Sequence, residues 1–435
     1  MTVATLGLIG IAVLIALLLL RVPVWIALVL VGFFGNAITL GWHGSFALAG
    51  TAPFDVATSY TLSVVPLFIL MGEIASESRL SAELFRAARV VLQGFRSGLA
   101  TATITASALF GAVSGSSLAN AATMTRIALP EMRKAGYDPG LATGSLAAGG
   151  SLGILIPPSI ILVIYAAIAE QSVPRLFAAG LLPGILLALL YVAVAIAVGV
   201  WRPHFAPDIG ARASLRDRLS ALRGTWQFLA LFIVTIGGIY TGIFTPTEAA
   251  AIGAFGAILL GVLGRRMGFV ELLRAVENSV LVSGLLFVIV IGANLFSFFI
   301  VQSHLPELLT EGARAAGLSP LMVMLLIIVV YLVLGCFLEG IGMVLITVPV
   351  FLPLVAAFGY DPIWFGILLV IMVEVSLLTP PVGMNLFVIQ AQAPDIRIMD
   401  IYRGVAPFLI APLALVVSLF LVPELALWLP RLFYG

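Results

Sequence analysis

Two stretches of the chain gather oxygen-bearing side chains inside otherwise apolar sequence. Hydroxyl and amide oxygens can coordinate hard cations such as sodium. The pattern therefore predicts a cation site, although each hydroxyl could instead hydrogen-bond within its own helix. The side chains are Ser114, Ser116, Ser117 and Asn120 in the first stretch, and Thr379 and Asn385 in the second.

Two pairs of adjacent prolines, Pro157-Pro158 and Pro380-Pro381, interrupt long apolar runs. A proline has no N–H and clashes with the carbonyl four residues before it. Unwound carbonyls of this kind coordinate sodium in transporters, while half-helix N-termini face substrate anions. The carbonyls expected to be free are those of Gly153 and Ile154 at the first break and of Ser376 and Leu377 at the second.

Three further ionisable residues lie in apolar sequence, where charges are costly. Glu339 stands in the middle of one apolar run and Glu374 stands shortly before Pro380. Each acid could be a cation ligand, a proton carrier or a neutral structural acid. Arg126 could contact a substrate carboxylate, or it could extend its side chain to the cytoplasmic face.

No pattern in the sequence indicates catalysis. The only lysine, Lys134, is followed by Ala135, so the phosphate-binding loop of ATPases is absent. The three histidines lack metal-ligand spacing, and neither His-Glu-x-x-His nor Gly-x-Ser-x-Gly occurs. We therefore expect a protein that is not an enzyme.

The composition is that of a membrane protein. Of the 435 residues, 62% are hydrophobic and 9% are charged, whereas soluble domains have about 25% charged residues. The net charge of +1 gives no reason to expect a nucleic-acid partner. The single cysteine, Cys336, cannot form an intrachain disulfide. Arg21 follows the first apolar run and no basic residue precedes it, so we expect a retained helix and not a cleaved signal peptide.

The two halves of the sequence repeat each other at a fixed offset of 223 residues. The motif Gly-Tyr-Asp-Pro occurs at residues 136–139 and again at 359–362. A Leu-Pro pair before it and the Pro-Pro pair after it recur at the same offset. The sequence therefore predicts a duplicated membrane unit, with copies at 1–223 and 224–435.

Apolar runs long enough to span a membrane, about 20 residues, fall into two matching sets. The runs 98–131 and 320–356 are too long for one span and have a polar, glycine-rich centre. We predict a re-entrant helical hairpin in each, although two ordinary helices with a short loop would also fit. Both sets also contain a helix broken at its Pro-Pro pair. The sets are 2–20, 23–40, 57–75, 98–131, 140–169 and 177–200, and 225–243, 246–263, 279–300, 320–356, 363–392 and 405–428.

The charges predict how the copies are oriented. If each hairpin makes no net crossing, 18 of the 21 Lys and Arg residues lie on one side, which the positive-inside rule assigns to the cytoplasm. Both termini then face outside, and the copies have opposite orientations. The fold class expected is all-α with an inverted repeat, which is typical of alternating-access transporters. The amphipathic segments 76–97 and 301–319 are expected at the membrane interface.

Three motifs resemble the large membrane subunit, or M-type subunit, of tripartite ATP-independent periplasmic (TRAP) transporters. They lie at residues 112–120, 149–159 and 378–386, in order and at matched repeat positions. The resemblance implies a sodium-coupled importer of small organic anions, such as C4-dicarboxylates or sugar acids, in a bacterial inner membrane. It also implies an elevator mechanism, in which a transport unit formed by 98–169 and 320–392 moves against a scaffold of the remaining helices.

The resemblance further implies the residues of the sites and the partners. A small four-helix membrane subunit and a periplasmic binding protein that selects the substrate are expected. Because the first repeat starts at residue 1 or 2, the small subunit is expected to be a separate chain. The sodium ligands would come from Ser114, Ser116, Ser117, Asn120, Gly153, Gly340, Thr379 and Gly383, and the substrate contacts from Ser116, Pro157, Glu339, Glu374, Asn385 and Arg126.

Two other readings remain open at this point. An inverted-repeat carrier that is coupled to protons, or that exchanges anions without a binding protein, would make Glu339 and Glu374 the central residues. A membrane scaffold or an intramembrane enzyme would leave the paired broken helices unexplained.

Overall fold

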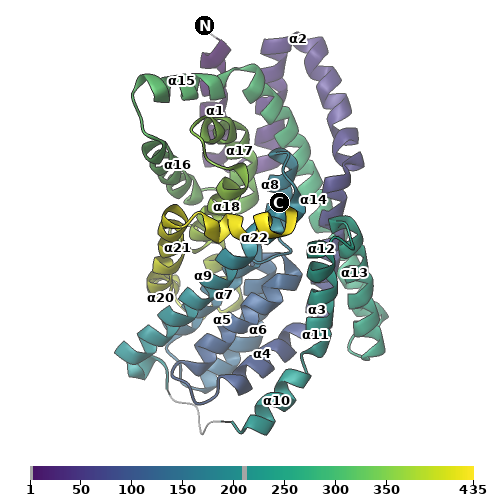
Figure 1. Ribbon diagram of the computed structural model, residues 1–435, viewed down its shortest axis with the longest axis vertical. Helices are drawn as coiled ribbons and strands as arrows, with labels where there is room; N and C mark the ends of the chain where they lie inside the picture. Colours follow the sequence, from purple (N-terminus) through teal and green to yellow (C-terminus); the bar gives the residue numbers. More distant parts are fainter. Residues whose placement is uncertain (1–2, 208–212) are drawn as a thin grey trace.

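The computed structural model describes residues 3–207 and 213–435, and within these ranges it consists of helices and turns without a β-strand. Figure 1 shows an elongated helical bundle with the N-terminal helices at one end and α10 (Leu215–Arg223) at the other. Seven segments of the described chain are long and apolar enough to cross a membrane, and a bent pair would add an eighth. The prediction of an all-α membrane protein is confirmed.

The repeated Gly-Tyr-Asp-Pro motif ends one helix and starts the next. Gly136 and Gly359 adopt φ angles of 75° and 84°, a left-handed conformation that glycine adopts at little cost. Asp138 and Asp361 each accept hydrogen bonds from two backbone N–H groups in the first turn of the following helix. The proline then occupies the first helical position, where its missing N–H is not needed. The duplicated motif therefore builds the same corner twice.

Each repeat contains a helical hairpin before this corner. The tips of the hairpins lie at residues 115–116 and 336–339. The second helix of each hairpin has 18 residues, and the two start 223 residues apart. The helices are α5 (Gly98–Ser114), α6 (Ser117–Lys134), α16 (Pro320–Gly335) and α17 (Gly340–Ala357). The re-entrant path of these hairpins through the membrane stays a prediction.

A broken helix follows each corner. In the first repeat the chain leaves α7 through a short 3₁₀ turn, Leu152–Ile154, and in the second it leaves α18 directly. Both Pro-Pro peptide bonds are cis. The helices are α7 (Pro139–Ser151) and α8 (Ile160–Ile168), and α18 (Pro362–Leu378) and α19 (Met384–Gln392).

The remaining long helices form a frame. Its largest internal contact joins α2 to α14, and glycine makes that contact close. A methyl group at Gly32 would lie 2.6 Å from the carbonyl carbon of Leu295. The frame helices are α1 (Val3–Leu19), α2 (Val24–Thr58), α3 (Tyr60–Glu77), α11 (Trp226–Phe232), α12 (Gly238–Tyr240), α13 (Pro246–Leu263) and α14 (Phe269–Gln302).

Three predicted boundaries were wrong, and residue 2, where the first predicted helix starts, lies outside the described residues. The helix predicted at 23–40 continues through a kink at Gly41 to Thr58. The helix predicted from 279 already begins at Phe269, because its charged residues lie on its outer face and do not interrupt it. The closing helix predicted at 405–428 is divided into α20 (Ile398–Val405), α21 (Ile410–Leu421) and α22 (Glu424–Tyr434).

The two amphipathic segments are helices, as predicted. The first, α4 (Leu80–Val91), packs on α5, and the second, α15 (Leu305–Ala315), packs on α17. A salt bridge of 2.7 Å between Arg266 and Glu83 joins α4 to the loop between α13 and α14. Each amphipathic helix therefore links the frame to a hairpin.

The closing helices lie against the hairpins and broken helices. Their broadest contacts connect α9 (Val173–Trp201) with α5, α18 and α22, and α20 with α7. In the sequence-based division these helices belong to the scaffold. They contact α5, α7 and α18 of the predicted transport unit, and the division itself stays a prediction.

An exposed ion pair connects the end of α6 to the segment after α19. Arg133 donates a hydrogen bond of 2.9 Å to Asp395, and this bond lowers the pKa of the Asp395 carboxyl below its usual value. A lowered pKa stabilises the fold above the unfolded-state value of about 3.9, and the contribution disappears as the pH falls through the lowered pKa. We therefore expect Asp395→Asn to lower the melting temperature slightly at pH 7, and we expect its difference from the wild type to shrink as the pH falls below the unfolded-state value. Melting curves across this pH range measure the difference, and a difference that persists at the acid end would contradict the assignment.

Candidate ion-binding site

The tip of the first hairpin packs against the first helix break. Gly115, at the tip, adopts a φ of 60°. A methyl group there would lie 2.8 Å from the carbonyl oxygen of Pro158 and 3.6 Å from the side chain of Ile160. Only glycine therefore allows the tip to approach the break this closely.

The tip of the second hairpin reaches the same place from the other side. A methyl group at Gly340 would lie 3.4 Å from Ile161 and 2.5 Å from Val373. The two tips thus contact consecutive residues, Ile160 and Ile161, at the start of α8.

Asn120 supplies an unused oxygen beside the first break. Its side chain is fully buried, and its amide nitrogen donates to the carbonyls of Ser107 at 2.9 Å and Gly150 at 3.4 Å. Its amide oxygen has no hydrogen-bond partner within the described chain, and the same is true of the Ser114 hydroxyl. Both groups are acceptors, so an electropositive ligand would satisfy them.

Backbone and side-chain oxygens of the first tip lie close to these acceptors. A methyl group at Gly153 would lie 3.1 Å from the Ser116 carbonyl oxygen and 3.5 Å from the Asn120 amide nitrogen. Ser116 caps α6 by accepting a hydrogen bond from the N–H of Ala119 at 3.4 Å. Ser117, the first residue of α6, is buried. The structure therefore brings together Ser116, Asn120 and Gly153, with Ser114 and Ser117 next to them in the chain.

Two of the four carbonyls expected to be free already have donors. The Ser159 hydroxyl donates to the Ile154 carbonyl, and the backbone N–H of Thr379 donates to the Ser376 carbonyl at 3.4 Å. These expectations were wrong because neighbouring groups replaced the bonds that the prolines removed. For the carbonyls of Gly153 and Leu377, no donor is present in the described ranges.

The second break is more open than the first. The Thr379 hydroxyl donates to the Val375 carbonyl at 2.6 Å, which leaves its lone pairs available. Gly383 is buried with a φ of 51°, and a methyl group there would lie 3.3 Å from the Leu377 carbonyl oxygen. Thr379 itself is half-buried, whereas residues 153–159 at the first break are all buried.

The expected substrate residues divide into two groups. Glu339 is half-buried at the second tip, and Pro157 is buried at the first break. Glu374 and Asn385 are fully buried. Glu374 is near Tyr191 of α9, and the Asn385 amide donates to the Ala147 carbonyl of α7 at 3.4 Å.

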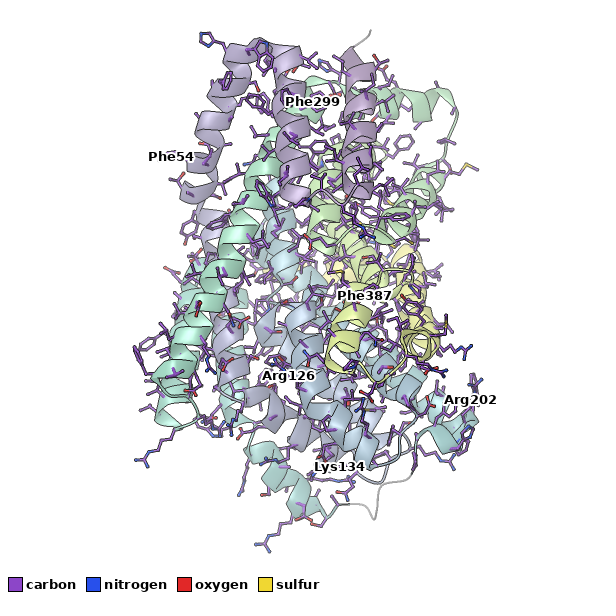
Figure 2. The ribbon with its side chains drawn as sticks, turned by 180° about the vertical axis from the view of Figure 1, so that it is seen from behind. Phe54, Arg126, Lys134, Arg202, Phe299 and Phe387 are labelled. Atoms are coloured by element: carbon purple, nitrogen blue, oxygen red, sulfur yellow. The ribbon has the colours of Figure 1, made fainter. Side chains whose placement is uncertain are left out.

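Arg126 does not lie at the first tip. It is exposed on α6, nine residues beyond Ser117, which is about 14 Å along a helix. Figure 2 shows it between the levels of Phe387 and Lys134. It lies near Glu73 of α3, whose carboxylate accepts a hydrogen bond of 3.4 Å from Asn278.

Ser107 was not among the site residues predicted from the sequence. Its buried hydroxyl has no partner within residues 3–207 and 213–435, and a methyl group at Gly149 would lie 2.8 Å from it. A signal was available, since Ser107 precedes Ser114 by seven residues, or two helical turns, and so shares its face of α5.

Comparison with known proteins gives one family. The profile of the family described as "Tripartite ATP-independent periplasmic transporter, DctM component" matches residues 11–425. The chain is 36% identical over 379 residues to the C4-dicarboxylate TRAP transporter large permease protein DctM of Pseudomonas aeruginosa, covering 87% of this chain and 88% of that protein. It is 33% identical over 446 residues to the protein of the same name from Vibrio cholerae, covering 97% and 96%. The sialic acid TRAP transporter large permease protein SiaM of Vibrio cholerae is 34% identical over 382 residues, covering 87% and 88%.

Two solved structures share the fold at low sequence identity. The YdaH transporter of Alcanivorax borkumensis superimposes with a TM-score of 0.65 at 17% identity, covering 90% of this chain and 89% of that one. MtrF of Neisseria gonorrhoeae gives a TM-score of 0.55 at 17% identity, covering 86% and 84%. Both likenesses concern the fold alone.

Proposed function

The chain belongs to the DctM family, the large permease component of TRAP transporters, and on that basis we propose that it imports small organic anions by coupling their uptake to sodium. The relatives are named as permeases for C4-dicarboxylates and sialic acid, and both ligand classes carry carboxylates. A small carboxylated anion is therefore the proposed substrate. The proposed location is a bacterial inner membrane.

One observation carries the choice of sodium. Asn120 and Gly153, each with an acceptor oxygen that has no donor in the described chain, approach each other where the first tip meets the first break, and the Ser114 hydroxyl at the end of α5 is also without a partner there. A buried acceptor without a donor costs about 1–3 kcal/mol, and a small monovalent cation removes that cost for several acceptors at once. A second sodium site is proposed at Gly340, Thr379 and Gly383, the residues that the resemblance to TRAP transporters implies at the second tip and the second break.

The proposed movement is of the elevator type. The frame of α1–α3 and α11–α14 stays fixed, and the hairpins and broken helices move as one body. Because α9, α20 and α21 pack on α5, α7 and α18, we assign them to the moving body in place of the scaffold. Sodium orders both tips, and the anion binds between them. A ligand shifts an equilibrium only through its differential affinity, so sodium and the anion must each strengthen the binding of the other.

The proposed assembly has two partners. One is the small membrane subunit as a separate chain, and the other is a periplasmic binding protein that delivers the anion. The binding protein would select the ligand, so the identity of the anion is a property of that partner.

The direct test is uptake by proteoliposomes that contain this chain with its small subunit and binding protein. Under an inward sodium gradient we expect accumulation of a C4-dicarboxylate such as succinate or of a sialic acid. With choline in place of sodium we expect uptake to fall about 5- to 150-fold, because the coupling free energy of linked ligands is typically about 1–3 kcal/mol. Equal uptake with and without sodium would reject sodium coupling.

A proton-coupled carrier is the second candidate, and Glu374 is the observation that favours it. Both of its carboxylate oxygens are buried without a hydrogen-bond partner in the part of the chain that the structure describes. Such a group is stable only as the neutral acid or with a bound cation. Glu374→Gln mimics the neutral acid, so sodium coupling predicts that uptake and its sodium dependence are retained. Proton coupling predicts instead that uptake by Glu374→Gln falls and that the remaining uptake no longer depends on pH.

A further inference from the structure

A charged cavity of about 940 Å³ lies at the opposite end of α7 from the hairpin tips. It is formed by the first turn of α7, the last turn of α9 with the following residues, and α20. The 13 residues of α7 extend about 20 Å at 1.5 Å per residue. The cavity is therefore separate from the proposed ion site.

The cavity lies where two apolar spans end. One span, α9, finishes at Trp201, and the other, Ile398–Leu421, begins beside it. The Trp201 side chain is 82% exposed, and tryptophan is enriched at membrane–water interfaces. The surrounding arginines place this end of both spans on the side predicted to be cytoplasmic. The cavity therefore opens at the level of the lipid headgroups.

Both carboxylates in the wall of the cavity are already engaged. Asp400 accepts hydrogen bonds from Arg397 at 2.9 and 3.2 Å. Asp138 accepts from the backbone N–H groups of Gly140 and Leu141. The Asp400 charge is therefore paired with Arg397, whereas Asp138 keeps its charge and caps the first turn of α7.

Two guanidinium groups of the wall have no such partner. Within residues 3–207 and 213–435, Arg202 and Arg403 form no ion pair. Arg202 lies over the ring of Phe205, 5.1 Å from its centroid, and Figure 2 shows it at the edge of the molecule. A planar guanidinium binds phosphate oxygens through two parallel N–H groups. The pair therefore favours a phosphate-bearing anion.

The rest of the wall is apolar and continues onto the lipid-facing surface. Leu141, Val198 and Pro407 line the cavity, and Ile196 and Ile410 lie exposed on the adjoining faces of α9 and α21. A free anion would leave this apolar wall unused, whereas the acyl chains of an amphiphile would cover it.

We propose that this cavity binds an anionic phospholipid, with its phosphate held between Arg202 and Arg403 and its acyl chains following the apolar wall onto α9 and α21. Basic pockets between membrane helices on the cytoplasmic side have the chemistry for such headgroups. Because α7 packs on both α9 and α20, the lipid stabilises this group of helices. Lipid binding in this cavity does not depend on which ion drives transport.

The test uses the purified protein in detergent with added lipids. Phosphatidylglycerol is expected to raise the melting temperature, whereas phosphatidylethanolamine, inorganic phosphate and glycerol 3-phosphate are not. Native mass spectrometry counts the retained lipid. If inorganic phosphate stabilises as well as phosphatidylglycerol does, the cavity is a free-anion site and the lipid assignment is wrong.

Matched variants locate the effect. Arg202→Gln and Arg403→Gln should each weaken phosphatidylglycerol binding about fivefold. The control is the pair Arg216→Gln and Arg223→Gln on the exposed α10, which should bind as the wild type does. Asp400→Asn frees Arg397 and should strengthen binding, so it tests the proposal even if an arginine variant fails to fold. Equal losses in the control pair, or no gain in Asp400→Asn, would overturn the proposal.

Discussion

Asn120→Ala is expected to raise the sodium concentration for half-maximal uptake by about 10- to 100-fold. The variant removes an acceptor oxygen that is fully buried and has no partner in the described chain. A bond to a charged group contributes about 1.5–3 kcal/mol, and each 1.4 kcal/mol corresponds to about a factor of ten in affinity. Uptake at a series of sodium concentrations, with potassium as the balancing ion, measures the shift.

Two variants separate the loss of a ligand from the loss of packing. Asn120→Asp keeps the oxygen and should restore most of the sodium affinity. Asn36→Ala is the matched control, because Asn36 is equally buried, has an equally unpaired amide oxygen and donates to the Leu295 carbonyl inside the frame. Asn36→Ala should lower the stability of the protein without changing the sodium dependence of uptake. An unchanged sodium dependence in Asn120→Ala would remove this residue from the site.

Gly111→Ala should reduce uptake more than tenfold while the protein still folds. Gly111 lies on α5 beside the first break, and an added methyl group would lie 2.8 Å from the Gly153 Cα and 3.1 Å from the Asn120 amide nitrogen. The methyl group must push the hairpin away from the break and so separate the ligands. Alanine favours a helix over glycine by about 1 kcal/mol, so a weakened α5 would not explain the loss.

A glycine in the frame provides the control for this variant. Gly284 lies within α14, and no atom lies within 4 Å of the position of an added methyl group. Gly284→Ala should therefore leave uptake unchanged. If Gly111→Ala transports as the wild type does, the close packing of hairpin and break is not required.

The duplicated motifs were sufficient to predict most of the topology. Fixed residues at a fixed offset located both corners and both breaks, because glycine, aspartate and proline act through local backbone geometry. The polar, glycine-rich centres of the runs 98–131 and 320–356 indicated the two tips. The start of α6 at Ser117 and of α17 at Gly340 follows that offset.

Other features depend on neighbours that the sequence does not reveal. The sequence did not predict that α2 continues past the kink at Gly41, because the glycine, histidine and proline residues in that segment are typical of a loop. The packing of α9 and α20 against the hairpins and broken helices could not be predicted, because hydropathy shows where a span lies in the sequence but not which helices are its neighbours. The bond from Ser159 to the Ile154 carbonyl is local, but it forms only because the break turns the hydroxyl back on its own helix.

The central claim is that sodium orders the hairpin tips, and the single cysteine provides a direct reporter. Cys336 lies at the second tip and is partly buried, so a maleimide modifies one known position in the wild-type chain. Sodium should slow this modification severalfold relative to choline at equal ionic strength, and Thr379→Ala should move the effect to higher sodium concentrations. Equal modification rates in sodium and choline, at sodium concentrations that support uptake, would contradict the account.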